Sequence, residues 1–116
     1  MNIMNTLKQK GYQWESLARD RYEKNGYVVL EKNFAIRWGE IDLILENEEE
    51  IVFVEVKVVD GIEDWNAYLS PRKMQALERS IESYCSNNLI AKDIRLDAVF
   101  VKNWKIVEVY ENISNT

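Results

Sequence analysis

Apolar positions recur at helical spacing in two segments of the chain. The first segment covers residues 7–25, where Thr6 can cap the start and Asn25-Gly26 can end the helix. The second begins at Ser70-Pro71, because serine is a favoured cap and proline is tolerated at the first helical position. Each helix would bury one apolar stripe: Trp14, Leu17, Ala18 and Tyr22 in the first, and Met74, Leu77, Ile81, Tyr84 and Cys85 in the second.

Five shorter runs are rich in apolar and β-branched residues, which is typical of strands. Two of them, residues 39–45 and 51–58, flank a polar tip and predict a β-hairpin. Because both faces of this hairpin are largely apolar, we expect an α/β fold with three α/β/α layers, in which helices cover both faces of a mixed central sheet of about five strands. The other strands are expected at 27–30, 94–101 and 106–110, with a strand end and loop at 31–38, a loop at 59–69 and a turn at 102–105.

The turn of the hairpin predicts its register. A symmetric turn at residues 47–50 places Asp42 opposite Glu55 and Glu40 opposite Lys57, unless a β-bulge intervenes. The other strand residues then divide between two faces of the sheet. Ile44, Ile51 and Phe53 share the face of Asp42 and Glu55, and the opposite face carries Ile41, Leu43, Leu45, Val52, Val54 and Val56.

Three charged residues, Asp42, Glu55 and Lys57, interrupt strands that are otherwise typical of a buried sheet. A buried charge is costly unless it is paired or binds a metal. Two adjacent carboxylates repel each other, and a bound divalent cation removes that repulsion. Because oxygen ligands suit Mg²⁺ or Mn²⁺, the pair Asp42 and Glu55 predicts a site for one of these ions.

The composition limits the chemistry that is open to the chain. Its 116 residues suffice for one domain, which we expect to span residues 1–116 with a core at about 7–110 and a polar tail at 111–116. The absence of histidine excludes Ser-His-Asp and Cys-His catalysis and His-ligated zinc. Cys85 is the single cysteine, which excludes an internal disulfide and fits a cytoplasmic location. The sequence shows neither a signal-peptide pattern nor an apolar run of about 20 residues, so we expect no membrane partner.

The net charge of −5 opposes strong nonspecific binding to nucleic acid, for which basic surface is needed. Four acidic residues gather at the predicted hairpin tip, far from Asp42, and the rest of the chain is near neutral. We interpret this cluster as a solvated turn rather than a functional site. Its members are Glu46, Glu48, Glu49 and Glu50.

Some charged residues admit both a structural and a functional interpretation. Glu15 lies on the apolar stripe of the first helix and could either pair with Arg19 or act as a third carboxylate of the site. Arg72 and Lys73 lie in the first turn of the second helix, where the helix dipole disfavours cations. They are either ordinary surface charges or part of an anion site, to which free backbone N–H groups would contribute.

Other residues are open in the same way. Trp65 and Tyr68 in the predicted loop could stack on a base, or they could pack on the sheet. Arg95 and Asp97 alternate onto one face of their strand and could pair with each other. Cys85 is interpreted as a small core residue, because no basic partner stands beside it in the sequence.

An Asp followed after a short spacer by Glu-x-Lys on a strand resembles the PD-(D/E)xK nuclease superfamily. Residues 39–44 (GEIDLI) and 52–57 (VFVEVK) resemble, more specifically, the YraN-like family of uncharacterised bacterial proteins, which are similar to archaeal Holliday-junction resolvases. The likeness extends from about Tyr12 to Tyr110. It includes Glu15, Gly26-Tyr27, Lys73 and Arg95-Leu96-Asp97.

The resemblance implies a restriction-endonuclease-like fold and a metal-dependent endonuclease that hydrolyses DNA phosphodiesters, with branched DNA as one candidate substrate. The catalytic residues carried over are Glu15, Asp42, Glu55 and Lys57. Mg²⁺ (or Mn²⁺) would be held by Asp42, Glu55 and the Val56 carbonyl, and Lys57 would orient or help deprotonate the attacking water. Resolvases of this type act as symmetric dimers, so a homodimer is a candidate assembly for a protein whose expected partner is DNA.

The chain also departs from the family pattern. Trp14 stands where the family usually has glycine, and Val58-Val59 stands where it usually has a hydroxyl residue and a basic one. These departures concern substrate contacts more than metal binding. Together with the charge of −5, they motivate a competing hypothesis, a noncatalytic module that keeps the nuclease fold and binds nucleic acid or a protein. The candidates for substrate contacts are Arg37, Glu40, Arg72 and Lys73.

Overall fold

The structure is a computed structural model that describes residues 3–60 and 68–113, with side chains from Trp14 onward. The described residues form two helices and five strands. In chain order these elements are α1 (Ile3–Lys24), β1 (Val28–Ile36), β2 (Gly39–Glu46), β3 (Glu50–Val58), α2 (Pro71–Asn88), β4 (Asp93–Lys102) and β5 (Lys105–Tyr110).

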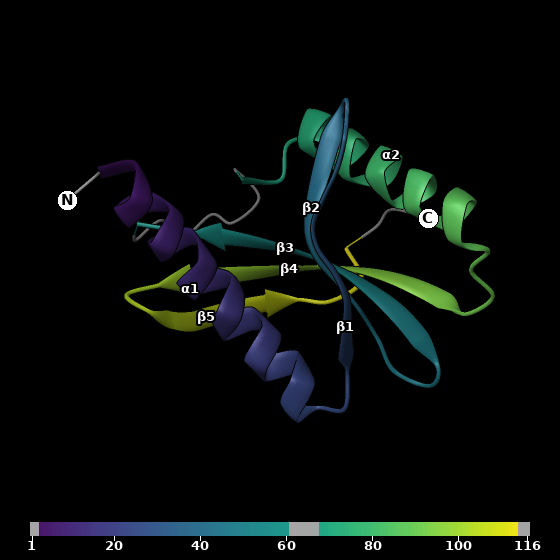
Figure 1. The fold of residues 1–116 in the computed structure, drawn as a ribbon, viewed down its shortest axis with the longest axis horizontal. Helices are drawn as coiled ribbons and strands as arrows, with labels where there is room; N and C mark the ends of the chain where they lie inside the picture. The colour runs from purple at the N-terminus through teal and green to yellow at the C-terminus, as the bar shows by residue number, and fades with distance from the viewer. Residues whose placement is uncertain (1–2, 61–67, 114–116) are drawn as a thin grey trace.

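The strands form one sheet in the order β1-β2-β3-β4-β5. β3 and β4 are parallel, whereas the other neighbouring pairs are antiparallel. α2 follows β3 and precedes β4, so it supplies the crossover that a parallel pair requires (Figure 1). The mixed sheet expected from the sequence is therefore confirmed.

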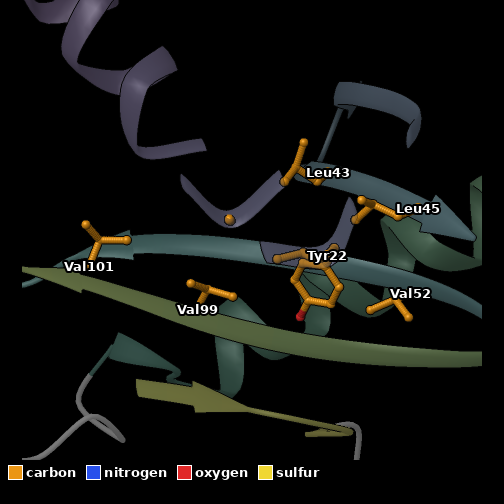
Figure 2. Packing of buried hydrophobic residues seen from close by; sticks show 8 residues of the cluster. Tyr22, Leu43, Leu45, Val52, Val99 and Val101 are labelled. Atoms are coloured by element: carbon orange, nitrogen blue, oxygen red, sulfur yellow. The ribbon is translucent and has the colours of Figure 1, made fainter. Parts of the chain in front are cut away.

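The two helices cover opposite faces of the sheet, which confirms the three-layer arrangement. The α1 layer packs on one face, where Figure 2 shows Tyr22 among the apolar side chains of the sheet. The α2 layer packs on the other face through Leu77, Ile81 and Tyr84. The strand residues buried under α1 are Leu43, Leu45, Val52, Val54, Val99 and Val101, and those buried under α2 are Ile41, Ile44, Ile51, Phe53 and Leu96.

The first helix and the first strand are both longer than predicted. α1 begins at Ile3, so Thr6 lies inside the helix and is not its cap. The predicted end is confirmed, because Gly26 adopts φ +90° directly after the helix. β1 continues to Ile36, through residues that we expected to form a strand end followed by a loop. It is an edge strand, and its polar side chains are solvated, which hides the strand pattern in the sequence.

The second half of the chain follows the prediction closely. Ser70 caps α2, because its Oγ accepts a hydrogen bond from the Lys73 N–H at 3.2 Å. β4 and β5 match the predicted strands to within one residue at each end. The polar tail differs, since the Ile113 N–H donates to the Leu96 carbonyl at 2.7 Å and Ile113 packs against the core. Tyr68 packs on Phe100, and Trp65 lies outside the described residues.

Candidate active site at a fork between two strands

The two strands that carry the candidate carboxylates separate in the middle of the sheet. β2 and β3 pair from Leu43 to Glu46 and from Ile51 to Val54, in the predicted register. Beyond Leu43, β2 is paired with β1 and β3 with β4. We call this point of separation the fork, and Asp42 and Glu55 are the first residues beyond it.

The fork changes how the predicted residues meet. Asp42 is not a ladder partner of Glu55. Instead, its Oδ2 accepts a hydrogen bond from the Val56 N–H at 2.7 Å. Glu40 lies opposite Ala35 of β1 rather than opposite Lys57. Both predicted pairs assumed a continuous hairpin, whereas β2 turns away to follow β1.

The fork also interrupts the alternation of side chains along β2. Ile41 and Leu43 are two residues apart and were predicted to share a face. In the structure Ile41 packs in the α2 layer, whereas Leu43 packs in the α1 layer. The face predicted for Ile41 was therefore wrong, and the irregularity leaves Asp42 between the two layers, within reach of β3.

Asp42 and Glu55 form a buried carboxyl pair. Glu55 is 5% exposed and Asp42 is half-buried. Burial, a hydrogen bond shared with Glu55 and the negative charge of Glu55 raise the pKa of Asp42 to about 8. The Val56 N–H and the Lys73 ammonium act in the opposite direction but do not offset these effects. The ionised form of Asp42 is therefore disfavoured beside Glu55, and a nearby positive charge would favour it.

Lys73 provides the only ammonium that the described residues place against this pair. Its Nζ lies 2.6 Å from Glu55 Oε2. Partial burial lowers the pKa of Lys73, but contact with Glu55 and the charges of Asp42 and Glu40 outweigh it and raise the pKa overall. Because Ser70 fixes the first turn of α2, it also fixes the backbone of Lys73. Lys73 is therefore engaged by Glu55 within the protein, and its predicted contact with a substrate stays a prediction.

Glu15 approaches the pair from α1. Its side chain is half-buried and is hydrogen-bonded to Asn33 of β1, a residue in the left-handed conformation with φ 52°. Burial and the charge of Asp42 raise the pKa of Glu15. Arg19, the alternative partner, contacts Glu23 at 3.1 Å and Asp20 at 3.6 Å. Glu15 thus belongs to the electrostatic environment of the fork.

The remaining candidates lie around the fork on exposed surface. Lys57 is exposed, and its Nζ is 6.0 Å from the Tyr68 ring centroid, with no carboxylate within ion-pairing distance in the part of the chain described. Glu40 and Arg72 are exposed as well. Arg37 lies over the ring of Trp38, with its Cζ 4.7 Å from the ring centroid. The sequence reasoning passed over Trp38, although a tryptophan in the turn before Gly39 was a visible signal.

The donor set at the fork fits a hard divalent cation. No three His, Cys, Asp or Glu side chains within the described ranges converge tightly enough to hold a metal on their own. Two carboxylates are nevertheless enough for Mg²⁺, which usually keeps several waters and uses one or two protein carboxylates. The raised pKa of Asp42 is consistent with such a site, because a bound cation would offset the same repulsion by Glu55 that raises it. Val56 contacts Asp42 through its N–H, so the predicted role of its carbonyl stays a prediction.

A second buried carboxylate, Asp97, lies on β4 opposite Val54 of β3 and contacts Tyr22 of α1, whereas Glu55 contacts Lys73 of α2. Asp97 is 0% exposed and accepts four hydrogen bonds: from Arg95 Nε at 2.9 Å and Nη2 at 2.8 Å, from Tyr22 Oη at 2.6 Å, and from the Asn112 N–H at 3.0 Å. Arg95 also donates to Glu50 at 2.9 Å. The predicted pairing of Arg95 with Asp97 is confirmed.

The acidic hairpin tip is only partly a solvated turn. Glu48 and Glu49 are exposed, as predicted. Glu46, however, pairs with Lys92 at 2.9 Å, and Glu50 pairs with Arg95. Two of the four acids therefore attach the hairpin to β4 and to the segment that precedes it.

The arrangement of the sheet and the helices indicates the fold class of the protein. A mixed sheet with a helix layer on each face is consistent with a restriction-endonuclease-like α/β fold. The chain belongs to the family described as "Uncharacterised protein family UPF0102", which it matches over residues 14–101. This is the YraN-like family that the sequence resembles, and the matched range includes Glu15, Asp42, Glu55 and Lys57.

Three relatives illustrate the extent of the similarity. A UPF0102 protein of Helicobacter hepaticus is 34% identical over 108 residues, which cover 92% of this chain and 96% of the relative. A UPF0102 protein of Campylobacter jejuni is 33% identical over 92 residues, covering 79% and 81%. A UPF0102 protein of Thermotoga petrophila is 37% identical over 87 residues, covering 75% and 81%. Within the described residues, neither helix is long and apolar enough to cross a membrane.

Proposed function

We propose that this protein is a metal-dependent endonuclease that hydrolyses DNA phosphodiesters, with branched DNA as a candidate substrate. The observation that supports the proposal is the buried pair Asp42 and Glu55 at the fork, where burial and mutual repulsion hold the pKa of Asp42 at about 8. A buried carboxyl group with a strongly raised pKa is typical of a functional site.

The residues of the fork have complementary roles in this proposal. Asp42 and Glu55 would hold Mg²⁺ or Mn²⁺, with the Val56 carbonyl as a further ligand. When bound, such an ion supplies a Lewis acid for a phosphate oxygen and lowers the pKa of a bound water. Lys57 lies two residues beyond Glu55 on β3 and has an exposed ammonium, which can contact the phosphate or the attacking water. Glu15 adds a third carboxylate, which can accept a proton from that water.

A second candidate function has an observation of its own. Lys73 already places a positive charge on Glu55 at 2.6 Å, which is how a retired metal site would be neutralised. The alternative is a noncatalytic module that binds nucleic acid or a protein on the same fold. The exposed apolar Val58, at the edge of the site, also favours binding over catalysis.

The test is cleavage of a labelled panel of single-stranded, duplex, flap and four-way-junction DNA in Mg²⁺, Mn²⁺ or EDTA. We expect cutting that requires metal and that falls by at least about 100-fold in Asp42→Asn and in Lys57→Ala. Asp93→Asn and Lys105→Ala make the same changes at exposed positions away from the fork and should keep parent activity. An Asp42→Asn protein that cuts as fast as the parent would show that the nuclease assignment is wrong.

Binding of DNA without cleavage would support the noncatalytic module. If no substrate is cut in either metal but one of them shifts in a gel, the noncatalytic module is the better description. Calorimetry with Mn²⁺ separates the two functions further, because a catalytic fork should bind the ion in the parent and lose it in Asp42→Asn. If DNA is neither cut nor bound, the search should turn to a protein partner.

A further inference from the structure

The turn between β1 and β2 carries an exposed tryptophan held by an arginine. Trp38 is 63% exposed, and the Arg37 guanidinium lies 4.7 Å from its ring centroid. An indole ring of this size usually buries most of its surface, so a ring displayed on a turn favours a contact with a partner. The stacked guanidinium holds the ring in place and adds positive charge beside it.

The turn is held close to the fork by the packing of Gly39. A Cβ at Gly39 would lie 2.7 Å from the Ala76 carbonyl oxygen, so the start of β2 rests directly on α2. Figure 1 shows the start of β2 beside α2. Asp42 is four residues from Trp38, which corresponds to about 13 Å along a strand. The ring therefore lies within a few nucleotides of the candidate site.

Two basic side chains near the fork are not engaged by a carboxylate of the described residues. The Arg37 guanidinium lies over Trp38, and the Lys57 ammonium lies 6.0 Å from the Tyr68 ring centroid. Lys73, by contrast, is paired with Glu55 at 2.6 Å. Arg37 and Lys57 are therefore available to phosphate groups of a strand that passes between the Trp38 turn and the fork.

We propose that Trp38, supported by Arg37, is a stacking platform for an unpaired DNA base next to the phosphate that lies at the fork. This inference rests on the proposed function and specifies its substrate: DNA with single-stranded character beside the cut. A flat ring can stack on any base that is free of its partner, whereas bases inside a duplex are already stacked on both sides. Arg37 would contact the backbone phosphate of the same nucleotide.

The chain provides a matched control for Trp38. Trp104, in the turn between β4 and β5, is 49% exposed, but its ring lies 5.6 Å from that of Trp14. It is thus an exposed tryptophan whose stacking partner is within the protein. Trp38→Phe keeps an aromatic face at the β1–β2 turn, whereas Trp38→Ala removes it.

The experiment is fluorescence anisotropy in EDTA at low salt, with a labelled single strand and a blunt duplex of equal length. We expect the parent to prefer the single strand and Trp38→Ala to bind that strand about tenfold more weakly. Trp38→Phe should stay within about threefold of the parent, and Trp104→Ala should bind like the parent. Circular dichroism confirms that each variant is folded.

Three results would overturn the inference: a parent that binds neither DNA, a Trp38→Ala protein that binds like the parent, and a Trp104→Ala protein that is equally impaired. Cleavage in Mg²⁺ is measured separately on the same variants. If the parent cuts DNA but Trp38→Ala binds the single strand normally, the stacking proposal is wrong and the proposed nuclease activity is retained. If the parent does not cut DNA but Trp38→Ala binds the single strand more weakly, the stacking proposal is retained and the proposed nuclease activity is wrong.

Discussion

Two buried carboxylate clusters, one in contact with α1 and the other with α2, differ in how completely the fold satisfies them. Asp97 accepts four hydrogen bonds, two of them from the Arg95 guanidinium, and these occupy the acceptor sites of its two oxygens. At the fork, Asp42 accepts one backbone hydrogen bond and shares another with Glu55. A single ammonium, that of Lys73, is in contact with Glu55.

This difference distinguishes a structural cluster from the proposed functional site. The donors of Asp97 come from α1, β4 and the segment after β5, so the network joins parts of the chain that are distant in sequence. A fully satisfied buried network makes the fold specific and rigid. The fork leaves two carboxyl groups short of positive charge, a cost that a bound cation can remove. Substitutions in the Asp97 cluster should therefore mainly lower stability, whereas substitutions at the fork should mainly change metal binding and the pH dependence of stability.

The largest effect is expected at the structural cluster. Asp97→Ala leaves the partly buried Arg95 without its main partner and should lower the free energy of unfolding by about 3–5 kcal/mol. Mn²⁺ binding by the folded protein should be unchanged, because Asp97 is not part of the fork. Urea unfolding and calorimetry measure the two quantities. If Asp97→Ala does not fold, Tyr22→Phe removes one donor and should lower stability by about 1 kcal/mol. A loss of Mn²⁺ affinity with unchanged stability would reverse the assignment of the two clusters.

The fork should make the metal-free protein less stable as the pH rises. The pKa of Asp42 is 3.8 in the unfolded chain and about 8 in the folded protein, so between these values the folded state binds the extra proton. Stability is then complete below about pH 4 and is lost as the pH rises toward 8, by at most about 1.4 kcal/mol per unit.

From pH 6 to pH 8 this loss amounts to about 2 kcal/mol, measured by urea unfolding in EDTA. Asp42→Asn should flatten the profile, because its amide does not titrate in this range. Asp93→Asn, at an exposed position, should keep the parent profile. A parent protein whose stability increases from pH 6 to pH 8 would contradict the buried, repelling pair.

The smallest effect is expected when the ammonium of the fork is removed. Lys73→Met deletes the cation that competes with a metal for Glu55, so Mn²⁺ should bind several-fold more tightly. Stability at neutral pH should fall by about 1 kcal/mol, because Glu55 loses its ion pair. Lys92→Met serves as the control, because it removes a similarly exposed lysine from an ion pair outside the fork, that with Glu46. Weaker Mn²⁺ binding in Lys73→Met would mean that Lys73 supports the metal site rather than competing for it.

The sequence predicted most of the fold because its signals are local. The stripe of α2, the cap at Ser70 and the β-branched runs of β3 and β4 each depend on residues close together in the chain. β1 was only partly recognised, because an edge strand can be polar and needs only its neighbour to form. The start of α1 was placed four residues too late, since no local feature required Thr6 to be the cap.

The candidate site was predicted in its residues but not in its geometry. A charge in a buried strand is visible in the sequence, so Asp42 and Glu55 could be selected. Lys57 follows from its spacing on the same strand. Their contacts could not be derived, because the prediction assumed that β2 and β3 stay paired through Asp42. The pairing of β2 with β1 beyond Leu43 decides that Asp42 contacts the Val56 N–H instead.

The sequence by itself determined which chemical groups are available: it has no histidine and carries two carboxylates in apolar strands. It also carries a family pattern that the comparisons confirm. Only the tertiary structure decided which groups share an environment. It brought Lys73 from α2 to Glu55, placed Glu15 of α1 near Asp42, and exposed Trp38 on a turn beside the fork. The physical reason is that residue type and periodicity are local properties, whereas charge compensation and burial depend on packing between elements that are distant in sequence.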